Sequence, residues 1–276
     1  MRIDAHQHYW QIGRNGHEWP TPDLPVIHRD FLPADLETEL VPLGIARTVL
    51  VQSQPAGADT DWLLDLAVRT PSVGAVVGWC DVRALDAPAR IVALAARPKL
   101  RGLRPMLQDL PSGWILDPAA APALAAMVDA GLVFDALIRP AHLPDIAALA
   151  DAYPTLTIVV DHGAKPAIAA REYEPWVARM RDLAARPNVA CKLSGLATEA
   201  GADWSPDDLA PYVRHLLDCF GADRLLWGSD WPVLRLAGGY AQWFRITDHL
   251  LSPLTESQRS SIFGDNAARI YGVAPA

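Results

Sequence analysis

Lysine, cysteine and long apolar runs are all scarce in this chain of 276 residues. Of its 24 basic residues only three are lysines, and the net charge is −8. Nucleic acids attract clustered positive charge, whereas the basic residues here are scattered among acidic ones, so a nucleic-acid partner is not expected. No apolar run reaches the roughly 18 residues that a membrane-spanning helix needs, so membrane insertion is not expected either.

The three cysteines form no CxxC pair, and an odd number fits a reduced, intracellular protein better than a disulfide scaffold. The first residues also lack the cationic segment and apolar stretch of a signal peptide. We therefore expect a cytoplasmic protein. Its cysteines are expected to act as small buried hydrophobic residues: Cys80, Cys191 and Cys219.

Glycine-rich phosphate loops are absent after the first expected strand, which disfavours an open nucleotide-binding sheet. Instead, short apolar runs alternate with Ala/Leu-rich stretches of helical period along the whole chain. The runs predict buried parallel strands at 2–8, 48–52, 75–81, 100–104, 133–138, 157–162, 189–195 and 225–230. The stretches between them predict helices at 61–70, 87–96, 118–130, 143–152, 173–185 and 206–220.

Eight strand–helix alternations predict an α/β fold, specifically a single-domain (β/α)8 TIM barrel. No low-complexity linker divides the chain. Residues 11–33, much of them proline-rich, are expected to form a loop over the active-site face.

Polar residues stand at the carboxyl ends of several predicted strands, where barrels of this type build their active sites. The first strand ends with His6 and His8, which alternation places on one side. The sixth ends with Asp161 and His162, and the eighth with Asp230. Each residue alone is weak evidence, since paired histidines can be solvated and an aspartate after a strand is often a helix cap. Together they predict a site.

Other polar residues are harder to interpret. Asp161 is expected to be structural, binding loop amides beside His162. Arg104 is open both to a salt bridge within the barrel and to a role in the site. Lys192 lies inside an apolar run and must meet polar groups, because a buried unpaired charge is strongly unfavourable. Four histidines are expected to be surface or loop residues without a role: His17, His28, His215 and His249.

Eight motifs, in order along the chain, together resemble the lactonase branch of the amidohydrolase superfamily. They are HQHYW at 6–10, VQ at 51–52, VGW at 77–79, GLR at 102–104, DHG at 161–163, KLSG at 192–195, GSDWP at 228–232 and FGDNA at 263–267. The branch includes hydrolases of sugar lactones (L-fucono-, L-rhamnono- and galactonolactone), of sulfomuconolactone and of a pyrone dicarboxylate. The resemblance implies a (β/α)8 barrel that hydrolyses a cyclic ester.

Carried over by position, the resemblance implies a catalytic set of His6, His8, His162 and Asp230. The same four residues would hold one divalent ion, Zn²⁺ or Mn²⁺, if a metal is bound. Some lactonases of this branch work without metal, so metal-independent catalysis stays open.

The chain departs from the wider superfamily on two strands. The superfamily usually has a bridging Lys or Glu on strand four, where this chain has Arg104. It usually has a further His on strand five, which here ends with Ile138 and Arg139, with His142 only later. A two-metal centre is therefore not expected.

As a hypothesis for the mechanism, Asp230 takes a proton from water and later delivers it to the leaving oxygen. The three histidines either bind a metal or donate hydrogen bonds to the oxyanion, which Lys192 also stabilises. Four residues are expected to bind substrate: Arg104, Trp10, Gln52 and Trp231. Trp79 and Trp227 are expected to fill the core.

A small-molecule lactone, most simply a neutral sugar lactone, is the expected substrate. A metal-dependent decarboxylase of an aromatic or unsaturated acid could use the same residues, and release of CO₂ would identify it. A non-catalytic carbohydrate-binding barrel is the alternative of another class, although a pure binder does not need aligned titratable groups. The sequence leaves the oligomeric state open.

Overall fold

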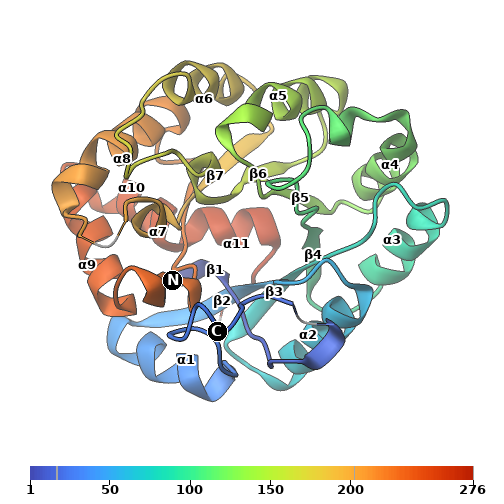
Figure 1. Cartoon of the computed structure of the whole chain (residues 1–276), viewed down its shortest axis with the longest axis horizontal. Helices are drawn as coiled ribbons and strands as arrows, with labels where there is room; N and C mark the ends of the chain where they lie inside the picture. The colour runs from blue at the N-terminus through green and yellow to red at the C-terminus, as the bar shows by residue number, and fades with distance from the viewer. Residues whose placement is uncertain (17, 202, 276) are drawn as a thin grey trace.

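Eight parallel strands, paired in sequence order, form the centre of the molecule, with helices around them (Figure 1). This computed structural model describes residues 1–16, 18–201 and 203–275. The strands are β1 (Arg2–Gln7), β2 (Ile45–Val51), β3 (Val73–Gly78), β4 (Leu100–Leu103), β5 (Val133–Ala136), β6 (Ile158–Val160), β7 (Val189–Leu193) and β8 (Leu225–Trp227). The predicted (β/α)8 barrel is confirmed.

Most predicted helices are present, although their bounds differ by a few residues. Two coincide with the prediction, at 143–152 and 206–220, whereas the helix predicted at 61–70 begins four residues earlier. The α-helices are α1 (Pro33–Leu40), α2 (Gly57–Arg69), α3 (Ala87–Ala95), α4 (Ala121–Asp129), α5 (Leu143–Ala152), α6 (Trp176–Ala184), α7 (Leu196–Glu199), α8 (Pro206–Phe220), α9 (Tyr240–Leu250), α10 (Glu256–Ser260) and α11 (Asn266–Tyr271). The prediction missed α1, α7 and the last three helices.

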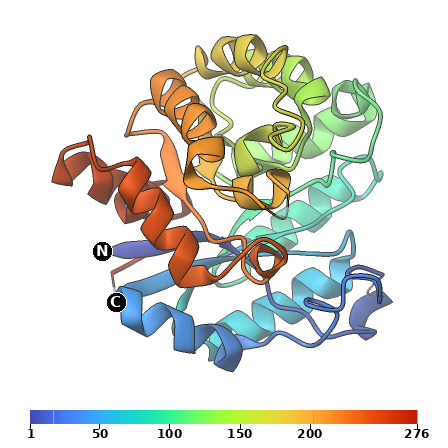
Figure 2. The same cartoon turned by 60° about the vertical axis from the view of Figure 1, so that its left-hand side comes forward.

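The barrel closes between β1 and the residues that follow β8. The backbone N–H of Asp230 donates to the His6 carbonyl at 2.8 Å, and the N–H of His8 donates to the Trp231 carbonyl at 2.8 Å. Gly228 permits this approach, because a Cβ there would lie 2.8 Å from the Cβ of His6. The last helices consequently lie beside the first elements of the chain (Figure 2).

A β-bulge near the end of β1 turns His6, and His8 just after the strand, toward the barrel axis. Three steps along β1, from Asp4 to Gln7, lie opposite only two along β2. Ala5 belongs to the packed barrel interior. Strict alternation would turn His6 outward, and the extra residue instead brings His6 and then His8 to the inner side.

The carboxyl ends of the observed strands are shorter than predicted. The strand predicted at 157–162 ends at Val160, and the strand predicted at 225–230 ends at Trp227. The reason is visible in the backbone, since His162 and Asp230 adopt left-handed φ angles of 55° and 59° that a strand cannot accommodate.

The C-terminal segment closes the opposite end of the barrel. Ala267 and Tyr271 of α11, followed by Val273, pack against the inward-facing apolar residues of the strands. Figure 1 shows α11 lying across the barrel behind the strands. In the described part of the chain, no helix combines the length and apolar character needed to cross a bilayer.

Most of the histidines and cysteines for which the sequence predicted no functional role lie where they were expected. His28 and His249 are exposed or partly exposed, and Cys80 and Cys191 are buried free thiols. The surface prediction is wrong for His215, because its ring is buried on α8 and lies 3.0 Å from the Val177 carbonyl. Cys219 was also expected to be buried, but it is only half-buried. His17 lies outside the described residues, so the prediction for it is not tested.

Candidate active site

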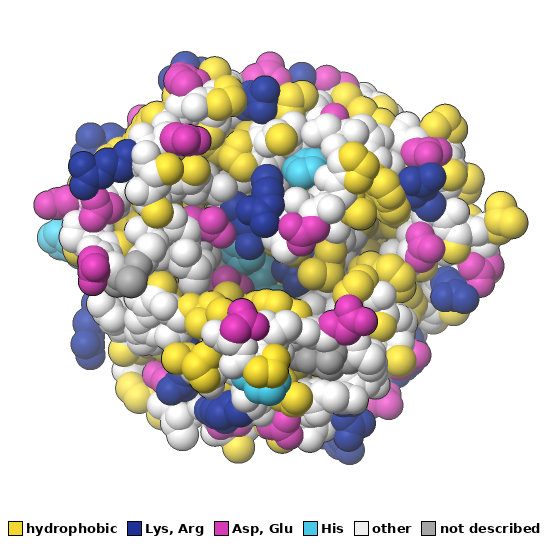
Figure 3. Space-filling model, viewed as in Figure 1, with side chains coloured by type: hydrophobic (Ala, Val, Ile, Leu, Met, Phe, Trp, Pro, Cys, Tyr) yellow, Lys and Arg dark blue, Asp and Glu magenta, His cyan; other side chains and the backbone are white. Residues whose placement is uncertain are grey.

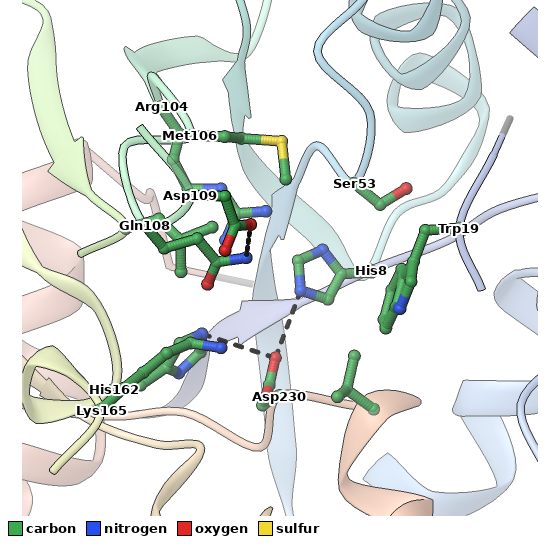
Figure 4. A pocket seen from close by; sticks show the side chains of 12 residues that line it. His8, Trp19, Ser53, Arg104, Met106, Gln108, Asp109, His162, Lys165 and Asp230 are labelled. Atoms are coloured by element: carbon green, nitrogen blue, oxygen red, sulfur yellow. Dashed lines mark hydrogen bonds and ion pairs between the residues drawn. The ribbon is translucent and has the colours of Figure 1, made fainter. Parts of the chain in front are cut away.

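A hollow opens in the face formed by the carboxyl ends of the strands, and a histidine is visible on its floor (Figure 3). The cavity has a volume of about 240 Å³. Figure 4 shows its lining, which is His8, Trp19, Ser53, Arg104, Met106, Gln108, Asp109, Leu137, His162, Lys165, Asp230 and Val233.

The floor of this cavity is organised around one carboxylate oxygen. Asp230 Oδ1 lies 3.2 Å from His8 Nε2, 3.6 Å from His6 Nε2 and 3.8 Å from His162 Nε2. All four side chains are at least nine-tenths buried. The structure thus brings together the strand-end residues that the sequence singled out from β1, β6 and β8.

His162 is held in an unusual conformation by its neighbours. Its left-handed backbone is unfavourable for a residue with a side chain, and such conformations concentrate at functional sites. Its Nδ1 lies 2.9 Å from the hydroxyl of Ser194, which follows β7. Gly195 passes directly beneath the ring, because a Cβ there would lie 2.5 Å from His162 Nδ1. His162 therefore has little freedom to move.

The backbone fixes the proton of His8. Its Nδ1 lies 2.8 Å from the Val51 carbonyl, which only accepts, so Nδ1 carries the proton and donates. The neutral ring then presents a lone pair at Nε2 toward Asp230 and the cavity. In the neutral form His8 Nε2 is thus an acceptor or a potential metal ligand, whereas a protonated ring would donate from Nε2 to Asp230.

Lys192 lies beneath the floor rather than in the cavity. Its fully buried ammonium is 2.5 Å from Asp135 Oδ2, 3.0 Å from Asp161 Oδ1 and 3.2 Å from His6 Nδ1. The hydroxyl of Tyr271 donates to the other oxygen of Asp135 at 2.8 Å. A buried polar column therefore links the C-terminal helix to His6.

The expectation that Asp161 binds loop amides is wrong. Its carboxylate lies between three basic side chains, with Oδ1 near Lys192 and 3.3 Å from His6 Nδ1, and Oδ2 3.3 Å from Arg104 Nη1. Position explains the difference, because Asp161 points into the barrel, away from the loop. Arg104 forms the salt bridge that was one of its two expected roles, with Asp161, and it also lines the cavity, so a role in binding substrate stays a prediction.

Burial and mutual charge determine the ionisation of the floor. Burial lowers the pKa of His162 to about 4, against the opposing influence of Asp230, and it lowers the pKa of His6 well below its usual value. Burial acts to raise the pKa of Asp230, but the imidazoles, His162 first among them, outweigh it and hold the pKa below its usual range. At neutral pH the imidazoles of His6 and His162 are therefore neutral, and the carboxylate of Asp230 is ionised.

The buried charges beneath are set in the same way. Burial disfavours the Lys192 ammonium, but Asp135 and Asp161 outweigh it and raise its pKa. Burial raises the pKa of Asp135 to about 6, whereas Lys192 counters burial at Asp161 and holds its pKa well below the usual value. Lys192 and Asp161 are consequently a buried ion pair at neutral pH.

These residues fit a single divalent ion. Ligand atoms of His6, His8 and Asp230 all lie within 4.8 Å of one another, and so do those of His6, Asp161 and His162. His8 already has its Nδ1 proton donated to a carbonyl, as ligating histidines usually do. Nitrogen and carboxylate donors of this kind suit Zn²⁺, and three protein ligands would leave a position for water.

Three residues expected to bind substrate are not in the lining that the described residues form. Gln52 instead orients Arg104. Its side-chain amide donates to the backbone carbonyl of Arg104 at 2.9 Å, and the backbone carbonyl of Gln52 accepts from the guanidinium. Trp10 donates to the Arg29 carbonyl at 2.8 Å and packs against Trp19. Trp231 is 1% exposed and packs edge-to-face against aromatic neighbours. The expected core role of Trp227 agrees with its burial.

Several lining residues were missed by the sequence analysis. Ser53, Gln108 and Lys165 lie in loops after β2, β4 and β6, at the same end of the barrel as the predicted residues. Trp19 comes from the loop expected to cover this face. Their position just after a predicted strand could have identified these residues, because every loop that follows a barrel strand borders this face.

Three histidines and an aspartate, gathered from the strand ends of a barrel at the floor of a cavity, form the kind of site that barrel enzymes use for catalysis. The chain matches the amidohydrolase family over residues 3–273 and belongs to it. The resemblance inferred from the motifs is thus confirmed, and so is the expectation of a hydrolase.

Three proteins similar to this chain are two lactonases and one amidohydrolase of known structure. The chain is 51% identical to an L-fucono-1,5-lactonase of Burkholderia ambifaria, over 99% of this chain and 96% of that protein. It is 35% identical to an L-fucono-1,5-lactonase of Burkholderia multivorans, over 99% and 96%. A crystal structure of an amidohydrolase from B. multivorans with bound zinc superposes with a TM-score of 0.93 at 35% identity, covering 99% of this chain and all of that one.

Proposed function

We propose that this protein is a sugar lactonase that hydrolyses a neutral polyhydroxylated 1,5-lactone, with L-fucono-1,5-lactone as its first candidate substrate. The observation that carries the proposal is the single Asp230 oxygen facing three imidazoles at the floor of the cavity. The activity of the two similar lactonases supports the choice of reaction. We also propose a cytoplasmic location.

Water attack on the lactone carbonyl needs a base, and Asp230 is ionised and faces the cavity. In the proposed mechanism its Oδ1 takes a proton from water while the lone pair of His8 Nε2 orients that water. Asp230 then returns the proton to the ring oxygen as the ester bond breaks. Arg104, which lines the cavity and stays charged, stabilises the oxyanion.

His6, His8, His162 and Asp230 are the residues that would hold a divalent ion. When bound, such an ion would acidify water and polarise the carbonyl. Lys192 is too deeply buried to touch substrate, so we assign it to positioning His6 and Asp161 rather than to the oxyanion.

The charges of the lining favour a neutral substrate over a dicarboxylate. The lining cations, Arg104 and Lys165, are each paired, with Asp161 at 3.3 Å and with Glu199 at 3.5 Å respectively. Asp109 and Asp230 add two carboxylates to the lining. A substrate with two negative charges would therefore meet repulsion that a neutral sugar lactone avoids.

A pH-indicator assay on L-fucono-1,5-lactone tests the proposal, using enzyme before and after chelation with its metal content recorded. We expect rapid acid release, and a loss of about 10³-fold or more in kcat for Asp230→Asn with an unchanged circular dichroism spectrum. Activity that disappears with the metal and returns with Zn²⁺ would identify the histidines as ligands. Near-wild-type turnover by the variant would remove Asp230 as the base, and release of CO₂ from an aromatic acid without lactone hydrolysis would favour a decarboxylase.

A further inference from the structure

Apart from Arg104 Nε, two polar side-chain atoms of the cavity lining have no hydrogen-bond partner among the described residues. They are the hydroxyl of Ser53, which is 4% exposed, and Gln108 Oε1. Both residues line the cavity, and Figure 4 places them on opposite sides of His8. A buried polar atom without a partner costs about 1–3 kcal/mol, so such atoms in a cavity wall are suited to a ligand that supplies the missing bond.

The amide of Gln108 is oriented by an ionic network. Its Nε2 donates to Asp109 Oδ2 at 3.0 Å, and that carboxylate also pairs with Arg139 at 3.3 Å. Arg139 Nε donates in turn to the backbone carbonyl of Gln108 at 3.2 Å. A carboxylate can only accept, so the Gln108 nitrogen must face Asp109 and the oxygen must face away from it. Gln108 therefore presents its oxygen as an acceptor, which requires an O–H or N–H donor on the ligand.

Ser53 follows β2 and stands on the other side of the floor. Its hydroxyl can both donate and accept, and a ligand hydroxyl can do the same. A carboxylate or sulfonate could bond to Ser53, but it has no proton to donate to Gln108 Oε1. A ligand with several hydroxyl groups satisfies both walls at once.

We infer that Ser53 and Gln108 are the residues that recognise substrate hydroxyls, and so select a polyhydroxylated lactone over a plain one. This inference rests on the proposed lactonase function and adds the residues that determine its specificity. Neither side chain is part of the carboxylate and imidazole floor, so both act on substrate binding rather than on the reacting atoms.

The test compares two cyclic esters with the same six-membered ring, L-fucono-1,5-lactone and the unsubstituted δ-valerolactone. Ser53→Ala and Gln108→Met should each lower kcat/KM for the sugar lactone about tenfold, through KM, with kcat within about twofold. Rates on δ-valerolactone should stay within about twofold of wild type. Ser72→Ala is the control, because Ser72 precedes β3 and its buried hydroxyl lies outside the described lining of the cavity.

Equal losses on both lactones would overturn the inference, since they would indicate a structural role. Unchanged KM for the sugar lactone in both variants would also overturn it. The Ser53 hydroxyl and Gln108 Oε1 would then bind only water, not substrate. A wild-type enzyme that hydrolyses neither lactone would refute the proposed function itself and this inference with it. A wild type that hydrolyses the sugar lactone, with variants that keep its KM, would refute the inference alone.

Discussion

Replacing Gly195 with alanine tests whether the position of His162 controls the reaction. Gly195 has a left-handed φ of 65°, and its added Cβ would lie 2.5 Å from His162 Nδ1. An ordinary contact begins at 3.4 Å, so the ring or the backbone must move by about 1 Å. Such a movement would break the 2.9 Å contact between His162 and Ser194. A misplacement of about 1 Å can cost on the order of 10²-fold in rate, which is the loss in kcat/KM that we expect.

The matched control is Gly131→Ala. Gly131 has a nearly identical φ of 63°, but nothing lies within 4 Å of its added Cβ. Both variants should therefore lose about 1–2 kcal/mol in free energy of unfolding from the backbone alone. Urea unfolding measures that shared loss, and the lactone assay measures the difference in rate. Full activity in Gly195→Ala at a stability equal to that of the control would refute the argument that His162 must be held in place.

Two further predictions concern buried charge. Lys192→Met leaves Asp135 buried without its cation and Asp161 with Arg104 as its remaining cation. It should lower the free energy of unfolding by about 3–5 kcal/mol in a urea titration, whereas a loss below about 1 kcal/mol would contradict the buried ion pair. His162 has its folded pKa lowered to about 4 from 6.5, so its contribution to stability is complete above pH 6.5 and is lost as the pH falls through 4. The stability difference between chelated wild type and His162→Gln should therefore shift by about 3 kcal/mol between pH 7 and pH 4, and a constant difference would show that folding does not lower the pKa of His162.

The sequence predicted the parts of the fold and the site that follow from local pattern. Buried strands show as apolar runs, and the ends of barrel strands converge, so His6, His8, His162 and Asp230 could be grouped without coordinates. Loops have no such periodicity. Ser53 and Gln108 were therefore missed, and tryptophans next to the motifs were assigned to the substrate although they pack in the core.

The sequence predicted only part of the buried polar column that links Tyr271 to His6. Lys192 was singled out because a charge inside an apolar run needs a partner, and the same reasoning applies to Asp135 inside the run at 133–138. Nothing local identifies the partners, since Asp135 and Lys192 are 57 positions apart and Tyr271 is 136 positions beyond Asp135. The β1 bulge was likewise missed, because it shows only in the pairing with β2.

Two of the last helices of the chain provide tyrosine hydroxyls that bind buried carboxylates close to the floor of the cavity. The hydroxyl of Tyr240 on α9 donates to Asp4 at 2.8 Å, and Asp4 also accepts from the hydroxyl and the N–H of Ser229, the residue before Asp230. Tyr271 on α11 donates to Asp135, the partner of Lys192.

Each tyrosine thus stabilises a buried carboxylate, and each carboxylate orients a strand end that carries part of the floor. Burial raises the pKa of Asp4 to about 6, and its four donors, which include the backbone N–H of His6, oppose that rise and favour the ionised form. The geometry around Asp230 and His6 therefore depends on α9 and α11, two helices that contribute no residue to the described lining of the cavity.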